Sequence, residues 1–393
     1  MKKTTLILSL LIFAFAMVII LAIGVLTFGR YLVDKASQED YYQYKLTNVT
    51  YAQLPAGLKG KVIDPKQVTI TFTDSARLKR FLDVYIEQFN DMQGEPLDLS
   101  FLNLSTLDNL DFVFAGKLTP ISPEENLLYY ACDFANDRRE LNINFYSLDL
   151  STIKSLKATF ACSYFTNDIS KLDVSQVTNM ESLFSNAVAF NQDLSAWDVS
   201  QVENMSFMFK ATNFNQALNS WDVGKVTKMT GMFVMNQQFN QNLNAWNVSK
   251  VTDMRSMFES ASAFNGDISS WDVSQVTSMH HMFRQATAFN GDLSTWNVAK
   301  VTDMQGMFIK AVNFNRDLSK WDISNVTDTS FMFSGATSFT SDLSKWNLSQ
   351  VTDTSFMFAL AKNFTSDLSQ WNVSKVTNMM GMFGGATKFN SDL

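Results

Sequence analysis

The 393-residue sequence has few cysteines, few histidines and no excess of positive charge. Its two cysteines, Cys132 and Cys162, form no C-x-x-C pair, which excludes a zinc ribbon and a thioredoxin-like redox motif. The formal net charge of −7 argues against a nucleic-acid-binding protein, because a phosphate backbone requires a basic stripe. G-x-S-x-G, phosphate-loop and H-E-x-x-H motifs are also missing, so we expect no catalytic site, no metal and no cofactor.

The one long hydrophobic run stands at the N-terminus. Residues 4–29 carry no charge and can cross a bilayer as a helix, which needs about 20 apolar residues. Lys2 and Lys3 favour an N-terminus in the cytoplasm. A cleaved signal peptide is the alternative, because residues 14–16 have the A-x-A form, but cleavage there would leave more hydrophobic sequence on the mature chain. We predict a transmembrane signal anchor at 1–29, with the rest of this single-pass membrane protein at the cell surface or in the periplasm.

A polar stalk (30–43) and a small α/β cap (44–92) are predicted next. The stretch VTITFT at 68–73 alternates like a strand. Asp74 or Ser75 can cap a following helix. The apolar face of that helix would hold Leu78, Phe81, Leu82, Tyr85 and Phe89. This face needs a cover, and so does the open end of a repeat array, so we expect the cap to close that end.

From residue 166 to 393 the sequence repeats itself about every 25 residues. The unit is F-N-x-D-L-S-x-W-D/N-V-S-x-V-T-x-M-x-x-M-F. All eight tryptophans of the chain share one place in it, namely Trp197, Trp221, Trp246, Trp271, Trp296, Trp321, Trp346 and Trp371. Residues 93–165 carry a degenerate form of the unit with Leu in place of Trp and Met, and we expect atypical N-terminal coils there.

Two periodicities within the unit predict one coil of a solenoid. In L-x-x-W-x-V-x-x-V, Trp197 and Val199 would point inward and Asp198 outward, as in a short strand. Met254, Met257 and Phe258 are spaced i, i+3 and i+4, as on one face of a short helix. Neither element can bury its face alone, so coils must stack. The predicted fold class is an α/β solenoid, a leucine-rich-repeat-like right-handed coil of short strand plus short helix.

The repeat resembles the 25-residue bacterial surface protein repeat of mycoplasma and Listeria surface lipoproteins, which is related to BspA-like leucine-rich repeats. The resemblance covers residues 165–393 strongly and residues 95–164 weakly. It implies an extracellular, cell-attached solenoid used for adhesion or for contact with a host or a partner, and it implies no reaction. The chain departs from the family in its anchor, which looks transmembrane rather than lipidated.

The candidate partner-binding face is the outward side of the predicted strands. It consists of Asp198, Ser200, Asp222, Asn247, Asp272, Asn297, Asp322, Asn347 and Asn372. Solenoids bind partners on extended faces of this kind. A solvated sheet surface is the alternative interpretation, since mixing Asp with Asn dilutes charge along the stack in either case.

Aromatic and acidic rows have structural alternatives as well. The Trp, Phe and Met rows could form a stacking platform for sugars or bases, but we expect them to be the core. Phe331 and Phe356 either refill the helix face where Thr replaces Met, or form an exposed contact patch. The second acidic row either binds calcium or caps turns. It consists of Asp168, Asp193, Asp267, Asp292, Asp317, Asp342, Asp367 and Asp392.

The two histidines and the two cysteines are the rarest of the reactive side chains. His280 and His281 lack repeated partners for zinc, and we expect them to be exposed. Cys132 and Cys162 are candidates for a disulfide that pins the irregular coils outside the cytoplasm.

The sequence therefore predicts a cell-surface binding or adhesion protein, not an enzyme, whose extended face contacts a protein or glycan on a host or neighbouring cell. The alternative is a structural envelope protein that assembles end to end, as a homo-oligomer, through an uncapped C-terminal coil.

Overall fold

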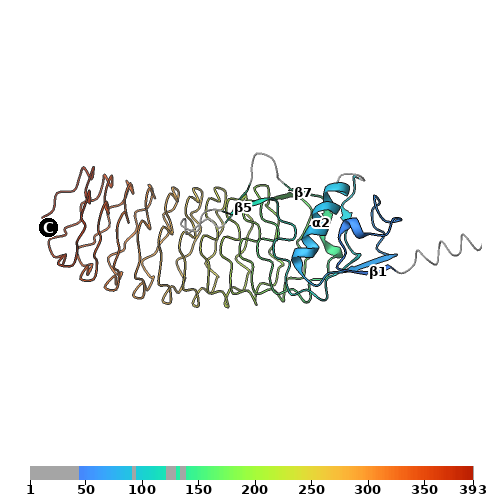
Figure 1. Ribbon diagram of the computed structural model, residues 1–393. Coiled ribbons are helices and arrows are strands. Elements are labelled where there is room, and N and C mark those ends of the chain that lie inside the picture. The colour runs from blue at the N-terminus through green and yellow to red at the C-terminus, as the bar shows by residue number, and fades with distance from the viewer. Residues whose placement is uncertain (1–43, 91–93, 121–129, 133–138, 393) are drawn as a thin grey trace, which may run out of the picture.

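The computed structural model describes residues 44–90, 94–120, 130–132 and 139–392. The chain forms an elongated rod with the cap at one end and the C-terminus at the other (Figure 1). The predicted anchor and stalk lie outside the described residues. Within those residues, no helix combines the length and the apolar character that a membrane span needs.

The cap is joined to the solenoid by a shared sheet. Strands β1 (Tyr44–Thr47) and β2 (Val68–Thr71) pair in parallel, and β2 pairs in parallel with β4 (Leu102–Asn103) of the first coil. The 3-10 helix η1 (Tyr51–Gln53) lies between β1 and β2 in the chain. Val68 and Ile70 of β2 are buried, as the alternation predicts. The sheet of the cap therefore extends into the first coil, where it ends at β4.

Helix α2 (Ser75–Phe89) covers the first coils (Figure 1). The Asp74 carboxylate caps it by accepting a hydrogen bond from the backbone N–H of Arg77, at 2.7 Å. Its buried face contains Leu78, Phe81, Leu82, Tyr85, Ile86 and Phe89. The same hydrophobic cluster continues from the cap to the last coils, so the apolar face of α2 closes the end of the core.

The atypical coils contain the remaining assigned elements. They are β3 (Leu97–Asp98), β5 (Leu118–Pro120), β6 (Tyr130–Cys132), β7 (Arg139–Leu141), β8 (Ile143–Asn144), η2 (Phe145–Ser147) and β9 (Ser163–Phe165). Pairs β3–β8 and β7–β9 are parallel, whereas β5–β6 is antiparallel. The segment of six residues from Arg139 to Asn144 thus pairs with β9 through β7 and with β3 through β8.

Beyond residue 165, the described coils consist of turns without an assigned helix or strand. One parallel bridge per coil joins each coil to the next. The bridged residues are Asn109, Ser155, Asn179, Asn204, Lys228, Asp253, Ser278, Asp303, Asp328, Asp353 and Asn378. Stacking of repeats is as predicted, but the secondary structure within each coil is not.

The predicted short helix is wrong. Met254, Met257 and Phe258 are all buried, as their spacing requires. However, the Met257 N–H reaches back only three residues, to the Met254 carbonyl, and the Phe258 N–H donates to Met282 of the next coil, at 2.9 Å. Because consecutive turns repeat every three to four residues, they bury the same positions as a helix. A segment this short gains little from helix propagation and more from bonds between coils.

The predicted short strand is also wrong, although its inward and outward directions are right. Trp271 and Val273 are buried and Asp272 is exposed. The Asp272 Oδ1 atom accepts the Ser274 N–H at 3.0 Å, and the Val276 N–H donates to the Val273 carbonyl. These local bonds use the N–H groups that a strand would give to its neighbour, so turns replace the ladder here.

Left-handed backbone recurs at two places in each regular coil, four residues apart. We call the first of these places the left-handed column. It is occupied by Ser182, Phe207, Gly231, Ser256, His281, Gly306, Phe331, Phe356 and Gly381. All of these residues except Gly381, which lies in the last coil, donate the backbone N–H to the next coil, so the column joins neighbouring coils.

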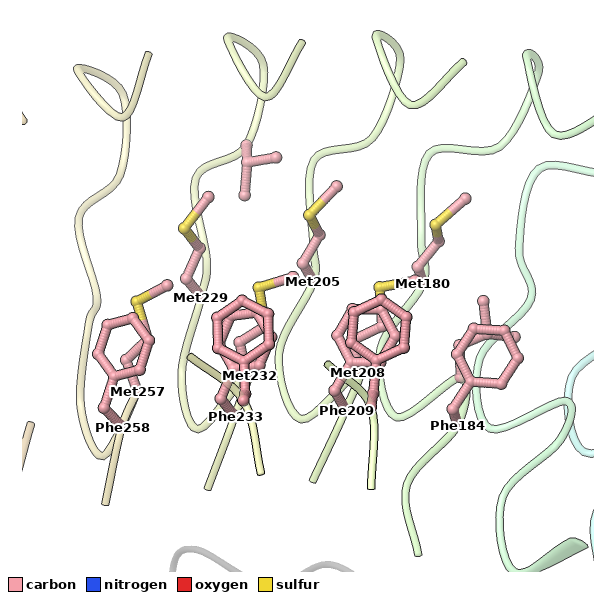
Figure 2. Packing of buried hydrophobic residues seen from close by; sticks show 14 of the residues in the cluster. Met180, Phe184, Met205, Met208, Phe209, Met229, Met232, Phe233, Met257 and Phe258 are labelled. Atoms are coloured by element: carbon pink, nitrogen blue, oxygen red, sulfur yellow. The ribbon is translucent and has the colours of Figure 1, made fainter. Parts of the chain in front are cut away.

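Two phenylalanine columns and a tryptophan column fill the interior. Figure 2 shows one of the phenylalanine columns, with Phe184, Phe209, Phe233 and Phe258, beside the methionines. In one coil the Phe258 and Phe264 rings stack at 3.8 Å, and Phe258 stacks on Phe283 of the next coil at 5.7 Å. The Trp271 indole N–H donates to the Leu243 carbonyl of the preceding coil, at 2.9 Å. The prediction that these aromatic rows form core is confirmed, because they are buried and their polar atoms are satisfied.

Candidate functional site

The outward row predicted from the sequence lies on one side of the solenoid. Its acidic and amide side chains are all exposed, namely Asp198, Asp222, Asn247, Asp272, Asn297, Asp322, Asn347 and Asn372, whereas Ser200 is half-buried. They recur at one position per coil, so they form a straight file along the rod.

Each side chain of the outward row closes a turn. Its Oδ1 atom accepts the backbone N–H two residues ahead, at 2.9–3.2 Å. The hydroxyls of the following serines and these N–H groups lower the pKa of Asp198, Asp272 and Asp322. These carboxylates are therefore ionised and held in one orientation at neutral pH.

A file of Lys and Gln runs beside the outward row. Lys225 Nζ donates to Gln201 Oε1 of the preceding coil at 2.5 Å, and Lys300 Nζ donates to Gln275 Oε1 at 2.7 Å. The pattern returns further along, where Lys375 Nζ donates to the Gln350 amide oxygen. The face therefore presents carboxylates and ammonium groups side by side, which suits a polar partner of mixed charge.

The second acidic row also closes turns. Asp267 Oδ1 accepts the Ser269 N–H at 2.9 Å. The same bond recurs at Asp168, Asp193, Asn242, Asp292, Asp317, Asp342 and Asp367. Turn capping is thus the arrangement present, and no group of three His, Cys, Asp or Glu residues in the described part of the chain is placed to hold a metal ion.

Phe331 and Phe356 do not refill the core. Both belong to the left-handed column, and their rings stack on each other at 4.8 Å outside the interior. Phe331 is 36% exposed. Thr329 and Thr354 take the buried Met places themselves, and the Thr329 hydroxyl donates to the Asp353 carbonyl. Core compensation is therefore wrong, because neither ring belongs to the buried core, and the contact patch stays a prediction.

The histidines are not exposed as expected, because the left-handed column directs His281 over Gly306 of the next coil. Burial is the main cause that lowers the pKa of His281 to about 4, and the neighbouring His280 and Arg284 lower it further. His280 Nδ1 lies 3.6 Å from Asp303 Oδ2. This pair of rings therefore fills a gap between coils.

Cys132 and Cys162 form a disulfide with Cα atoms 5.6 Å apart. The bond ties β6 to the turn that leads into β9. It therefore fixes the irregular segment against the last of the atypical coils.

The structure also contains a recess that the sequence did not predict, at the junction between the atypical and the regular coils. Two adjoining cavities lie there, lined by residues such as Glu140, Tyr146, Tyr164 and Asp168. Comparison of repeats could not find them, because most of these residues stand where the repeat fails. The only signal in the sequence was the interruption of the repeat, in which two tyrosines stand in an irregular segment.

These features define a solenoid of stacked turn-built coils, closed by an α/β cap, with polar files on its surface. Three overlapping stretches, residues 130–246, 210–319 and 290–393, match the family described as "Mycoplasma protein of unknown function, DUF285". Together they span well over half of the chain, so the chain belongs to this mycoplasma repeat family. No curated protein matches its sequence.

Proposed function

We propose that the protein is a cell-surface binding or adhesion protein whose outward row contacts a protein or glycan on a host or neighbouring cell. The observation that carries this proposal is the file of exposed, pre-oriented Asp and Asn side chains, repeated in every regular coil from Asp198 to Asn372. Repetition at a fixed spacing lets weak contacts add along an extended partner. We assign no catalytic reaction to the chain.

An extracytoplasmic location belongs to the same proposal. The uncharged residues 4–29 support a membrane anchor. The Cys132–Cys162 disulfide supports an oxidising compartment. The resemblance of the repeat to Listeria surface repeats and to BspA-like leucine-rich repeats supports the same placement.

Charge reversal along the outward row tests the proposal. Asp272→Lys with Asp322→Lys inverts two charges on the file, and the matched control is Asp272→Asn with Asp322→Asn, which keeps both turn-closing acceptors. We expect reversal, but not the control, to abolish binding of protein-coated beads to host cells. Equal adhesion by reversed and control proteins with the same melting temperature would contradict this role.

End-to-end assembly is the second candidate function. In the last coil Met379 and Met380 are 39% and 62% exposed, whereas Met304, at the place of Met379 in an inner coil, is fully buried. Because α2 covers the other end of the core, such contacts would join two C-terminal coils rather than build a filament. Light scattering of the full chain over a range of concentrations tests this: a dimer lost in Met380→Asp supports it, and a monomer at every concentration counts against it.

A further inference from the structure

The recess at the junction forms because one chain segment changes partners. Strand β7 pairs with β9, with Leu141 opposite Phe165, but two residues later Ile143 pairs with Leu97 on the other side. From Ile143 onward the backbone pairs with Leu97, and only side chains, such as Asn167 and Phe165, still join the segment to the coil of Phe165. The recess lies at this change of partners.

Two adjoining cavities occupy this recess. The larger, of about 300 Å³, is lined by Glu95, Asn144, Tyr146 and Asp168 among others. The smaller, of about 150 Å³, is lined among others by Glu140, Asn142 and Tyr164. Asn167 lines both cavities, so they adjoin, and we call the two together the junction groove. Its size lies at the lower end of the range for small-molecule sites, roughly 300–1,000 Å³.

The floor of the groove is a fixed row of amides. Asn167 Oδ1 accepts the Ile143 N–H at 2.9 Å, and Asn167 Nδ2 donates to Asn142 Oδ1 at 3.0 Å. The Asn142 N–H in turn donates to Asn90 Oδ1 at the end of α2, at 2.7 Å. Because these side chains hold each other, the polar floor is pre-organised for a ligand.

Two exposed tyrosines stand along the groove. Tyr146 is 44% exposed and Tyr164 is 39% exposed, in contrast to the buried tryptophans of the regular coils. Tyr146 lies beside Asp168 in the lining of the larger cavity, and the Lys171 ammonium lies 5.9 Å from its ring centre. An exposed ring offers a flat apolar surface beside polar groups.

The remaining lining favours hydroxyl groups over charges. None of the residues that line the two cavities, all within the described part of the chain, is Lys or Arg, which disfavours phosphate and other anions. The carboxylates of Glu95, Glu140 and Asp168 are spread among amides, and Asp168 Oδ1 already accepts the Ser170 N–H. Acceptors and amide donors beside aromatic faces match a ring that has hydroxyls at its edge and C–H groups on its face.

We propose that this junction groove binds a neutral oligosaccharide of two or three pyranose rings. The tyrosines would pack against the C–H faces of the sugar rings, and the carboxylates and amides would bond the hydroxyls. This site lies apart from the outward row, so it stands or falls independently of the proposed adhesion function.

Calorimetric titration of the full chain tests the groove, in a detergent without a sugar headgroup. The probes are cellotriose, chitotriose and maltotriose, with spermidine and inorganic phosphate as charged competitors. We expect saturable binding of at least one trisaccharide. Tyr164→Ala should weaken it at least about tenfold, and Tyr146→Phe, which keeps the ring, should weaken it less.

Leu360→Ala is the matched control, because Leu360 is a 54% exposed apolar residue far from the groove. It should leave saccharide affinity unchanged. Absence of binding by all three trisaccharides at millimolar concentration would overturn the proposal. So would unchanged affinity in a Tyr146→Ala, Tyr164→Ala protein that melts like the parent, or tight binding of spermidine or phosphate in place of sugar.

Discussion

The regular coils and the atypical coils at residues 93–165, which we call the junction coils, both bury apolar side chains between neighbours, but they do so in different ways. In the regular coils many aromatic side chains stack on their own copies, as Trp271 does on Trp246 and Trp296. The junction coils must instead fit the cap, whose shape is not that of a coil, and they use short strand pairs and a disulfide. Repetition therefore gives the rod its stability, and the break in repetition gives it a concave site.

The largest effect is expected at the centre of the regular coils. Trp271→Ala should lower the free energy of unfolding by about 3–5 kcal/mol, because it leaves a cavity against two neighbouring coils. Trp271→Phe keeps most of the ring but leaves the Leu243 carbonyl without its indole donor, so it should cost only about 1–3 kcal/mol. Denaturant unfolding of both variants measures the difference, and equal losses would show that ring volume does not decide it.

Removal of the disulfide should act on the junction alone. The Cys132–Cys162 bond closes a separation of 30 residues, for which chain entropy gives about 3.6 kcal/mol. In a Cys132→Ser, Cys162→Ser protein, we expect faster hydrogen exchange at the amides of β9, whereas the amide of Phe283 keeps its protection. If exchange rose equally in both places, the two regions would form one cooperative unit.

These expectations rest on features that the sequence predicts unequally. Burial of Trp, Met and Phe was predictable, because it depends only on which positions recur. Turns in place of helix and strand were not, because Met254, Met257 and Phe258 face inward in either structure. The turn-capping role of Asp267 was one of two open interpretations, whereas the junction groove depends on the switch of partners at Ile143, which no repeat pattern encodes.

A glycine of the left-handed column tests how closely the column packs against the neighbouring coil. A Cβ atom at Gly231, where φ is +57°, would collide with the Phe207 ring of the preceding coil. Gly231→Ala should therefore destabilise the protein by about 1–3 kcal/mol, and adding Phe207→Ala should recover part of the loss. Gly94→Ala isolates the backbone cost, because φ there is +68° and nothing lies within 4 Å. Equal losses at both glycines would mean that the Phe207 contact contributes nothing.

His281 should make one regular coil sensitive to mild acid. Its pKa is lowered from 6.5 to about 4 mainly by burial, so the unfolded chain binds the proton more readily. Stability is then full above about pH 6.5 and falls as the pH drops towards 4. His281→Phe copies the residue found at this place in Phe207, Phe331 and Phe356. It should remove about 1–2 kcal/mol of that pH dependence, measured by thermal unfolding at pH 7 and pH 4.5. An unchanged slope would assign the acid sensitivity to other groups.

The smallest effect is expected on the outward row, where function rather than stability is proposed. Asp272 closes its turn with a carboxylate whose pKa is lowered by the Ser274 hydroxyl and N–H. A lowered folded-state pKa stabilises the protein above about pH 4, and this contribution is lost as the pH falls further. Asp272→Ala should therefore cost less than about 1 kcal/mol at pH 7 and almost nothing at pH 2, because the residue is exposed. Asp272→Asn keeps the Oδ1 acceptor, as Asn247 and Asn297 do in other coils, and should be neutral at both values. A large loss in Asp272→Asn would show that charge, and not turn closure, holds the outward row in place, and the row would then be part of the scaffold like the tryptophan column.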